Sequence, residues 1–311
     1  MNYLNGLLNK KKVSGYANTF HVNSYLFEPN NENDIFQIVD IANNKNLNIC
    51  CSGSGLSYAD LITNKDNIIV KTDKLNQILK YDKINGVIRV QSGVTFNSIY
   101  QVILLDNWYL PSCPGGGDVS IGGAISNNVH GKDSFKNGNF GANVESFKII
   151  KSDGTKENIF KKDEAFKYIV SGIGLFGIIT EVTLKLKKIV SNYVQYKNTI
   201  HRNIEEIIEY KEANNQKYDF AVSWVDCFSS NENIGRGITK QATWLKKEKN
   251  LEIDQLKKTL KKSKKIFNLI PSYPTWELMS PFVNRQSFKI INKIYFNYSK
   301  LFTFGNSKIQ L

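Results

Sequence analysis

Apolar and polar positions in the first 189 residues alternate between helical and strand spacing. In residues 33–46 an apolar stripe that starts at Ile35 recurs at i, i+3, i+4 and i+7, which predicts a helix capped by Asn33 or Asp34. Toward the end of residues 171–188 apolar residues alternate with polar ones, which predicts a long strand. The other predicted elements of this part are strands over 47–51, 68–71, 87–91 and 144–151, a helical turn over 121–125, and helices over 95–105 and 164–170.

The pattern changes near Ser191, where glycine becomes rare and lysine, asparagine and tyrosine become frequent. Beyond this point a helical pattern over 204–213 lies between strand patterns over 193–200 and 220–225. Residues 246–265 are rich in lysine at helical spacing, which is typical of a solvated helix face. The change of texture predicts two domains, residues 1–189 and residues 190–311.

Glycines are concentrated in one stretch, residues 110–144, which holds eight of the chain's 21 glycines among mostly small or polar residues. Two shorter loops, 53–55 and 172–177, also carry closely spaced glycines, and the first of them follows a predicted buried strand. Because glycine lets backbone N–H groups approach an anion closely, usually a phosphate, this grouping predicts a shared anionic ligand. The alternative is a set of glycine-rich surface turns without a ligand.

The charge balance points to an anionic partner. The 311 residues carry a formal net charge of +13, and 41% of them are hydrophobic, which is enough for a substantial core. The partner classes are nucleic acid, a phosphorylated substrate and an anionic membrane surface. The lysines are scattered, however, and the chain has no RNA-binding signature, zinc-finger spacing or basic-helix pattern, so we predict no nucleic-acid partner.

Cysteine usage and the start of the chain set the expected compartment. None of the four cysteines stands in a C-x-x-C pair, so we predict no metal site and no redox dithiol. The adjacent Cys50 and Cys51 are expected to be buried strand residues rather than a disulfide. No apolar stretch has the length of a signal peptide or of a membrane span, which predicts a cytoplasmic protein.

Three motifs carry most of these glycines: GSGLSYAD at 53–60, PGGGDVSIGGAISNNVHGKD at 114–133 with NGNFGANV at 137–144, and GIGLFGIITEVTL at 172–184. They resemble the loops of flavoproteins of the vanillyl-alcohol oxidase type, which have the p-cresol methylhydroxylase FAD-binding fold. Within that family, VHGKD followed by NFGANV is most similar to the decaprenylphosphoryl-ribose 2-oxidase-like sugar oxidases. The resemblance covers nearly the whole chain and is most specific in its first 189 residues.

The resemblance implies an α+β fold. A two-subdomain FAD-binding domain of the p-cresol methylhydroxylase type is expected over 1–189, followed by an incomplete antiparallel-sheet substrate (cap) domain over 190–311. In such proteins backbone amides wrap the FAD pyrophosphate. The residues that the resemblance assigns to the cofactor are Gly53, Ser54, Gly55, Leu56, Ser57, Tyr58, Pro114, Gly115, Gly116, Val119, Ser120, Gly122, Gly123, Ser126, Asn127, Val129, His130, Gly131, Gly177, Ile178 and Ile179.

The resemblance also suggests where chemistry takes place. His130, Lys132 and Tyr58 are implied to lie near the flavin ring and the substrate, and Trp224 is implied to form a wall of the sugar pocket. Each residue has a simpler reading as well: a histidine can be a core residue, a lysine a solvated surface charge, and an aromatic residue a packing element. Aldonolactone and alditol oxidases of the family carry a flavin-linked histidine at the position of Leu56, so FAD is expected to bind noncovalently here.

The function that the resemblance implies is that of an FAD-dependent oxidoreductase acting on CH–OH groups. It would oxidise a secondary hydroxyl of a small-molecule or lipid-linked sugar, such as a cell-wall or polysaccharide precursor, with peripheral contact to the inner face of a membrane. The alternatives are an aldonolactone or alditol oxidase of the same fold and a non-catalytic FAD-binding module. Family members continue beyond the position that matches Leu311 and supply a catalytic lysine there, so a fragment or a truncated product is expected.

Overall fold

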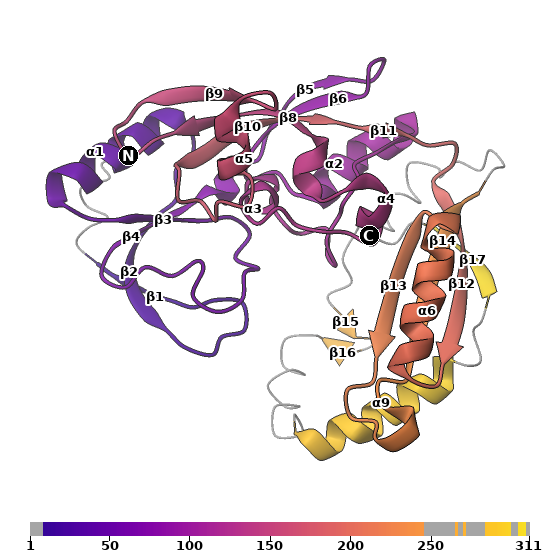
Figure 1. Cartoon of the computed structure of the whole chain (residues 1–311). Coiled ribbons are helices and arrows are strands. Elements are labelled where there is room, and N and C mark those ends of the chain that lie inside the picture. Colours follow the sequence, from indigo (N-terminus) through magenta and orange to yellow (C-terminus); the bar gives the residue numbers. More distant parts are fainter. Residues whose placement is uncertain (1–8, 246–264, 267–269, 272–283, 300–303, 309–311) are drawn as a thin grey trace. The chain divides into compact units, whose positions relative to one another are not determined.

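The structure is a computed structural model that describes residues 9–245, 265–266, 270–271, 284–299 and 304–308 (Figure 1). The chain divides into two compact units, residues 1–188 and residues 189–310. The helical pattern predicted over 246–265 lies outside the described residues, apart from its last position.

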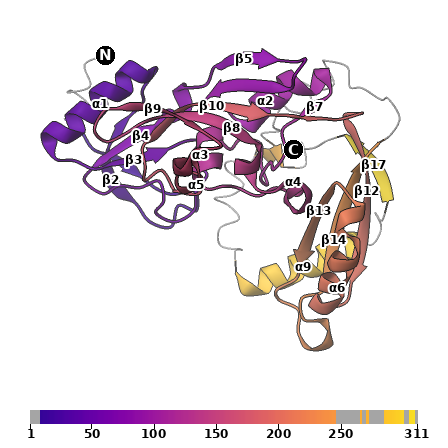
Figure 2. The ribbon, with the colours of Figure 1, turned by 45° about the horizontal axis from the view of Figure 1, so that its top comes forward.

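The first unit begins with a small four-stranded sheet that packs against one long helix. Its elements are β1 (Lys11–Val13), β2 (Val22–Phe27), α1 (Glu32–Lys45), β3 (Ile49–Ser52) and β4 (Ile68–Lys71). The strand order is β1-β2-β4-β3, with β2 and β3 parallel to the central β4. Ile35 and Ile38 on the apolar stripe of α1 are buried in one cluster with Ile68 and Val70 of β4, and Figures 1 and 2 show α1 beside this sheet. Full burial of each such side chain stabilises the fold by about 1.5–3 kcal/mol.

The ends of α1 differ from the prediction. The helix is capped by Asn31, whose side chain accepts a hydrogen bond from the N–H of Asp34 at 3.0 Å, and not by Asn33 or Asp34. At the other end Asn46 adopts a left-handed conformation with φ of 52°, which terminates the helix. The strand predicted from residue 47 therefore starts only at Ile49, after the chain has turned.

A five-stranded antiparallel sheet forms the larger part of the first unit. Its elements, with one helix, are β5 (Ile78–Asp82), β6 (Val87–Gln91), β8 (Val144–Ile150), β9 (Lys156–Phe160), α5 (Glu164–Ile169) and β10 (Ile178–Lys185). The order is β5-β6-β10-β8-β9, and Val182 of the central β10 lies opposite Val90 of β6 and Phe147 of β8. The alternation predicted for this strand is confirmed, because Val182 and Leu184 are fully buried.

Short elements lie before, within and after the glycine stretch of the first unit. They are α2 (Phe96–Ile103), β7 (Trp108–Tyr109), α3 (Ile121–Ser126), α4 (Ser134–Asn137) and β11 (Lys187–Lys188), which pairs with β7. The side chain of Thr95 caps α2 by accepting from the N–H of Ser98. The hydroxyl of the buried Tyr100 in α2 donates a hydrogen bond to the carbonyl of Leu110 at 2.6 Å, which fixes the start of the glycine stretch.

The second unit is an antiparallel sheet in the order β13-β14-β12-β17. The elements of this unit are β12 (Tyr193–His201), α6 (Ile204–Asn214), β13 (Phe220–Val225), β14 (Gly237–Trp244), α9 (Arg285–Ser299), β17 (Phe304–Lys308) and the small pair β15 (Lys265–Ile266) and β16 (Ile270–Pro271). Tyr210 of α6 donates to Gln241 of β14, whereas Tyr295 of α9 contacts Trp224 of β13. Trp224 pairs with Ile238 of β14, so these two side chains lie on the same face of the sheet. Gln241 is three residues further along β14, and side chains an odd number of residues apart lie on opposite faces. The two helices therefore contact opposite faces of the sheet.

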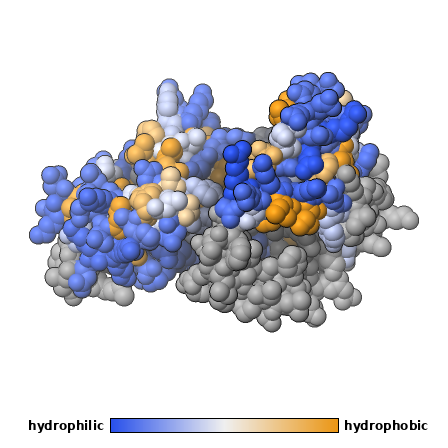
Figure 3. All heavy atoms as spheres, turned by 90° about the horizontal axis from the view of Figure 1, so that it is seen from below, coloured by the Kyte–Doolittle hydropathy of each residue, from blue (hydrophilic) through white to orange (hydrophobic). Residues whose placement is uncertain are grey.

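The predicted elements β12, α6 and β13 are confirmed within one residue at their ends. No strand was predicted over β14, and no element over α9 or β17. The short 3-10 helices of the described residues are η2 (Thr72–Lys74), η3 (Leu104–Asp106), η4 (Phe140–Asn143), η5 (Asn215–Lys217) and η6 (Asn231–Asn233). On the face drawn in Figure 3 hydrophilic residues cover most of the described surface, and apolar residues gather in separate patches.

Candidate functional site

The first two glycine loops contact each other in the first unit. Gly53 directly follows β3, and Ser120 directly precedes α3. A Cβ atom placed on Gly53 would overlap the hydroxyl oxygen of Ser120, so only glycine permits this approach without a shift. The N–H of Ile121 donates to the carbonyl of Val94 at 2.8 Å, and Ser120 forms a bridge with Thr95, which fixes the start of α3 against the segment that joins β6 to α2.

The same loops present backbone N–H groups that lack protein acceptors. Within the described residues, the N–H groups of residues 54–57 and of residues 115–117 donate to no backbone or side-chain oxygen. A Cβ on Gly115 or Gly116 would meet nothing within 4 Å, so the backbone there borders open space. Unpaired amides on closely spaced glycines form a cradle of positive potential that suits an anion such as a pyrophosphate.

A small cavity that is open to solvent is lined by residues of the first glycine loop and of α3. Of the residues assigned to the cofactor from the sequence, those that line it are Gly53, Ser57, Gly122, Gly123, Ser126, Asn127, Gly177, Ile178 and Ile179. The lining residues that were not assigned to the cofactor from the sequence are Cys51, Leu61, Ile62, Thr72, Ser92, Ile173 and Gly174. Ile173 and Gly174 belong to the third glycine loop, so the glycine motif could have identified them as ligand-binding residues. Thr72 and Ser92 directly follow β4 and β6, and no sequence motif marks them.

The other residues assigned to the cofactor do not line this cavity. They lie on the adjoining segments of the three motifs and are Ser54, Gly55, Leu56, Tyr58, Pro114, Gly115, Gly116, Val119, Ser120, Val129, His130 and Gly131. Gly55 has φ of +72°, and a Cβ atom there would meet nothing within 4 Å, so its conformation favours glycine for backbone reasons. Gly177, with φ of +143°, directly precedes β10, and a Cβ atom there would come within 2.7 Å of the carbonyl oxygen of Ile150.

The residues expected to perform chemistry are all near the surface of their unit. The side chain of Tyr58 is 67% exposed, and its ring contacts Tyr16 edge to face at 5.6 Å between centroids. His130 and Lys132 are exposed on either side of Gly131, where a Cβ would come within 2.6 Å of the carbonyl oxygen of Cys113. The tight packing of Gly131 holds the backbone between the imidazole and the ammonium group close to the start of the glycine stretch.

Two thiols of the first unit, those of Cys51 and Cys113, do not provide a nucleophile. Burial raises the pKa of Cys51, which lines the cavity, to about 12, and burial likewise raises the pKa of Cys113 to about 12. Both thiols are therefore protonated near neutral pH, and the thiolate is the reactive form. Leu56 has no nucleophilic atom, so none of these three side chains offers a covalent attachment point for a flavin.

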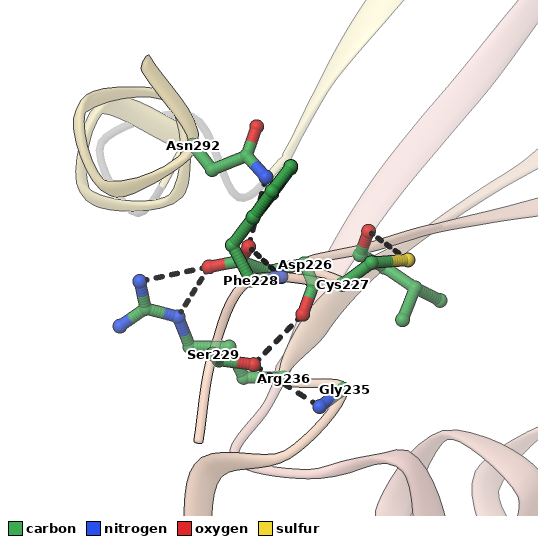
Figure 4. Close-up of polar contacts among 8 residues, drawn as sticks. Asp226, Cys227, Phe228, Ser229, Gly235, Arg236 and Asn292 are labelled. Atoms are coloured by element: carbon green, nitrogen blue, oxygen red, sulfur yellow. Dashed lines mark hydrogen bonds and ion pairs between the residues drawn. The ribbon is translucent and has the colours of Figure 1, made fainter. Parts of the chain in front are cut away.

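In the second unit Trp224 lies two residues before Asp226, the buried carboxylate of an ion pair. The indole ring of Trp224 contacts the ring of Tyr295 at 4.8 Å. Two residues further, the carboxylate of Asp226 accepts from Nε and Nη2 of Arg236 at 3.0 and 2.9 Å and from Nδ2 of Asn292 at 2.8 Å (Figure 4). Burial by itself would raise the pKa of Asp226, but these hydrogen bonds and the Arg236 charge hold it below the usual value. This clamp ties α9 to the ends of β13 and β14.

The residues of the first unit fit FAD. The unpaired amides and the open space at Gly115 and Gly116 suit the pyrophosphate, and the apolar edges of Ile173, Ile178 and Ile179 line the cavity where flat apolar rings can pack. Within the described residues no group of three or more His, Cys, Asp or Glu side chains is arranged to hold a metal ion.

Comparison with known proteins agrees with this assignment. Residues 24–159 match the FAD binding domain family. The chain is 25% identical over 268 residues to decaprenylphosphoryl-beta-D-ribose oxidase of Mycolicibacterium smegmatis, a match that covers 84% of this chain and 56% of that protein. It is 22% identical over 152 residues to alditol oxidase of a Streptomyces species, which covers 49% of this chain and 36% of that protein.

A solved structure shares the fold. Alkyldihydroxyacetonephosphate synthase superimposes with a TM-score of 0.60 at 14% identity, over 71% of this chain and 50% of that one. The chain thus carries an FAD-binding domain with the p-cresol methylhydroxylase-type fold, and the predicted fold class and cofactor are confirmed. The chain spans about half the length of the first relatives that it matches.

Proposed function

We propose that this chain belongs to an FAD-dependent oxidoreductase that oxidises a secondary hydroxyl of a sugar. The observation that carries the proposal is the set of unpaired amides at residues 54–57 and 115–117, on two glycine loops that meet at Gly53 and Ser120, together with a cavity lined by all three glycine loops. Its relatives by sequence include a sugar oxidase and an alditol oxidase by name. Bound FAD would supply the acceptor for a hydride from the carbinol carbon, and a base would have to take the hydroxyl proton.

The chain's own residues then have distinct tasks. The amides of the first and second glycine loops hold the pyrophosphate, and the absence of a nucleophile at Leu56 leaves the cofactor noncovalently bound. His130, Lys132 and Tyr58 are the candidates for polarising the substrate hydroxyl, and Trp224 is the candidate for a wall of the sugar pocket. We assign no general base among them.

The proposed substrate is a small-molecule or lipid-linked sugar at the inner face of a membrane. None of the described helices is both long and apolar enough to cross a membrane. Support for peripheral contact comes from α9, which has no acidic residue and exposes Ile290, Ile291, Ile294 and Tyr298 beside its basic residues. Such a basic amphipathic helix is suited to lie in the surface of an anionic bilayer.

Two alternative functions can be distinguished by the experiment described below. In an alditol or aldonolactone oxidase, a free alditol or lactone would reduce the flavin. Against this alternative, the chain has Leu56 at the position of the flavin-linked histidine of those enzymes. A non-catalytic FAD-binding module would bind FAD and leave it oxidised with every sugar.

The test starts with the purified chain loaded with FAD. Acid precipitation should release the yellow cofactor into the supernatant, and flavin that stays with the polypeptide would contradict noncovalent binding. Anaerobic mixing of the complete protein with a polyprenyl-phosphate sugar should bleach the flavin absorbance. Bleaching by alditols alone would favour the first alternative, and no bleaching by any sugar would favour the second.

The role of His130 is tested in the same assay. If the imidazole acts on the substrate or the flavin, His130→Ala should slow flavin reduction roughly a hundredfold, the low end of acid–base contributions. FAD affinity should stay nearly unchanged, because other residues hold the pyrophosphate. A wild-type reduction rate in the flavin-loaded variant would remove His130 from the list and leave Lys132 and Tyr58.

A further inference from the structure

Ser112, at the start of the glycine stretch, has an unusual backbone conformation. Its φ is +62°, in the left-handed region, and its side chain is fully buried. A residue other than glycine adopts this region at a cost and persists there only when its surroundings hold it. The contacts that hold Ser112 therefore reveal what the fold maintains at this point.

The main contact of Ser112 is with Asp133. The N–H of Ser112 donates to both carboxylate oxygens of Asp133, Oδ1 at 3.1 Å and Oδ2 at 3.2 Å. The hydroxyl of Ser112 donates to the carbonyl of Gly138 at 2.6 Å and accepts from Nδ2 of Asn143 at 3.3 Å. Ser112 thus joins three parts of the glycine stretch that are separate in sequence.

Asp133 is itself almost completely buried, with 1% of its surface exposed. Its Oδ2 atom also accepts from Nδ2 of Asn137 at 2.9 Å, and the amide oxygen of Asn137 accepts from Nζ of Lys187 at 3.0 Å. A buried carboxylate needs such donors, because removing it from water without them is costly. The position of Asp133 is therefore fixed by several partners at once.

The segment from His130 to Lys132 is held between these groups. A Cβ on Gly131 would come within 2.7 Å of Oδ1 of Asp133 and 2.8 Å of the carbonyl carbon of Ser112. The N–H of Gly131 donates to Oγ of Ser134 at 2.8 Å, so the segment is also fixed from its other side. His130 and Lys132 flank this constrained glycine, and their backbone positions depend on the Ser112–Asp133 contact.

We propose that Asp133 is a positioning residue of the site. Its carboxylate holds Ser112 in the left-handed conformation and thereby fixes the backbone of His130 and Lys132 beside the start of the glycine stretch. The inference rests on the proposed function for its catalytic meaning, but the positioning itself can be read without flavin or substrate.

The experiment uses the whole chain labelled with ¹³C-histidine. The chain contains three histidines, so each gives a separate signal. In Asp133→Asn the amide keeps one acceptor and places an NH₂ donor in the site, so it cannot accept from Ser112 with both atoms. The NMR cross-peak of the His130 imidazole should move or split in the apo protein, while those of His21 and His201 stay in place. With FAD bound, flavin reduction should slow at least tenfold.

Asp82→Asn is the matched control. Asp82 also accepts from three N–H groups, those of Ile84, of Asn85 and of the Asn85 side chain, but in the turn between β5 and β6. This variant should leave the His130 cross-peak unmoved. An unmoved His130 cross-peak in folded Asp133→Asn would overturn the proposal.

A second background guards against loss of folding. Ser112→Gly removes the strain, because glycine adopts this φ freely, so Ser112→Gly/Asp133→Asn can be read if Asp133→Asn does not fold. The His130 cross-peak should differ between the double variant and Ser112→Gly, and coincident peaks would overturn the proposal. A chain that binds no FAD would refute the proposed function and leave this comparison intact.

Discussion

Gly53 and Ser120 approach so closely that a Cβ atom on the glycine would overlap the serine hydroxyl oxygen. The contact joins the end of β3 to the start of α3 and so brings two glycine loops to one cavity. Gly53 and Ser57 of the first loop and Gly122 and Gly123 of the second all line this cavity. The site therefore depends on a contact between two segments that are distant in sequence.

This contact can be measured as a coupling. Gly53→Ala should weaken FAD binding about tenfold, about 1.4 kcal/mol, because the loops must separate to admit the methyl group. Ser120→Ala removes the overlapping atom, so the double variant should regain part of the lost affinity. FAD titration of the four proteins gives the coupling energy, and strictly additive losses would show that the overlap is not the cause.

The adjacent glycines of α3 should respond differently to substitution. A Cβ on Gly122 meets the Cβ of buried Ser92 at 2.9 Å, whereas a Cβ on Gly123 meets only Oγ of Ser120, at 3.1 Å. Gly122→Val should lower the free energy of unfolding by about 1–3 kcal/mol through overpacking. Gly123→Val should keep the fold and lower FAD affinity at least tenfold, and urea denaturation beside FAD titration separates the two effects. Unchanged affinity in folded Gly123→Val would place the pyrophosphate elsewhere.

Arg236 should stabilise the second unit far more than a comparable arginine at the surface. Arg236→Gln leaves the buried carboxylate of Asp226 without its cation, which should cost about 3 kcal/mol. In the matched control, Arg202→Gln breaks the exposed pair with Glu206 and should cost less than about 1 kcal/mol. Chemical denaturation compares the two, and equal losses would mean that the clamp in Figure 4 does not stabilise the unit.

His201 should make the second unit sensitive to acid. Its side chain is 3% exposed, and among the described residues its Nε2 has no hydrogen-bond partner. Burial lowers its pKa, while the charge of Glu206 opposes the shift. The unfolded chain therefore binds the proton at a higher pH than the folded chain, so stability is fully present above about pH 6.5 and is lost as the pH falls through the folded pKa.

The denaturation midpoint should accordingly be lower at about pH 5.5 than at about pH 7.5. His201→Gln should remove most of that difference. His21→Gln, at an exposed position, should retain it. The same pH dependence in His201→Gln as in the native chain would assign the effect to other groups.

The exposed apolar face of α9 should support binding to anionic vesicles. Ile290 and Ile294 are 61% and 63% exposed, and Arg285, Lys289 and Lys293 accompany them on the helix. Replacing both isoleucines with glutamine should weaken co-sedimentation with phosphatidylglycerol vesicles at least tenfold, because the apolar burial is lost. Ile84→Gln, in the turn between β5 and β6 and 85% exposed, is the control and should have no effect.

Vesicles of phosphatidylcholine alone should bind the native chain weakly, because they lack the negative charge. Equal binding by the double variant would exclude α9 as the contact. Self-association that disappears in the double variant would show that the face pairs with protein instead.

Local sequence determined much of what lies along the chain. Periodicity depends only on neighbours in sequence, so it can indicate which side of an element is buried. It did so for the apolar stripe of α1 that starts at Ile35, for the alternation in β10 and for the inner face of α2. The glycine motifs likewise indicated an anion cradle and, by resemblance, its cofactor. These inferences needed no knowledge of the partners of each element.

Tertiary structure alone decided which segments meet. Nothing local marks Asp133 as the partner of Ser112, Thr72 and Ser92 as cavity residues, or Asp226 as the clamp of α9, since each depends on a contact between distant segments. β14 escaped prediction because its polar residues Thr239 and Gln241 are buried along with Ile238, and that burial depends on β12 and β13 on its two sides. A pattern shows that a face is covered, whereas the partner that covers it is chosen by the folded chain.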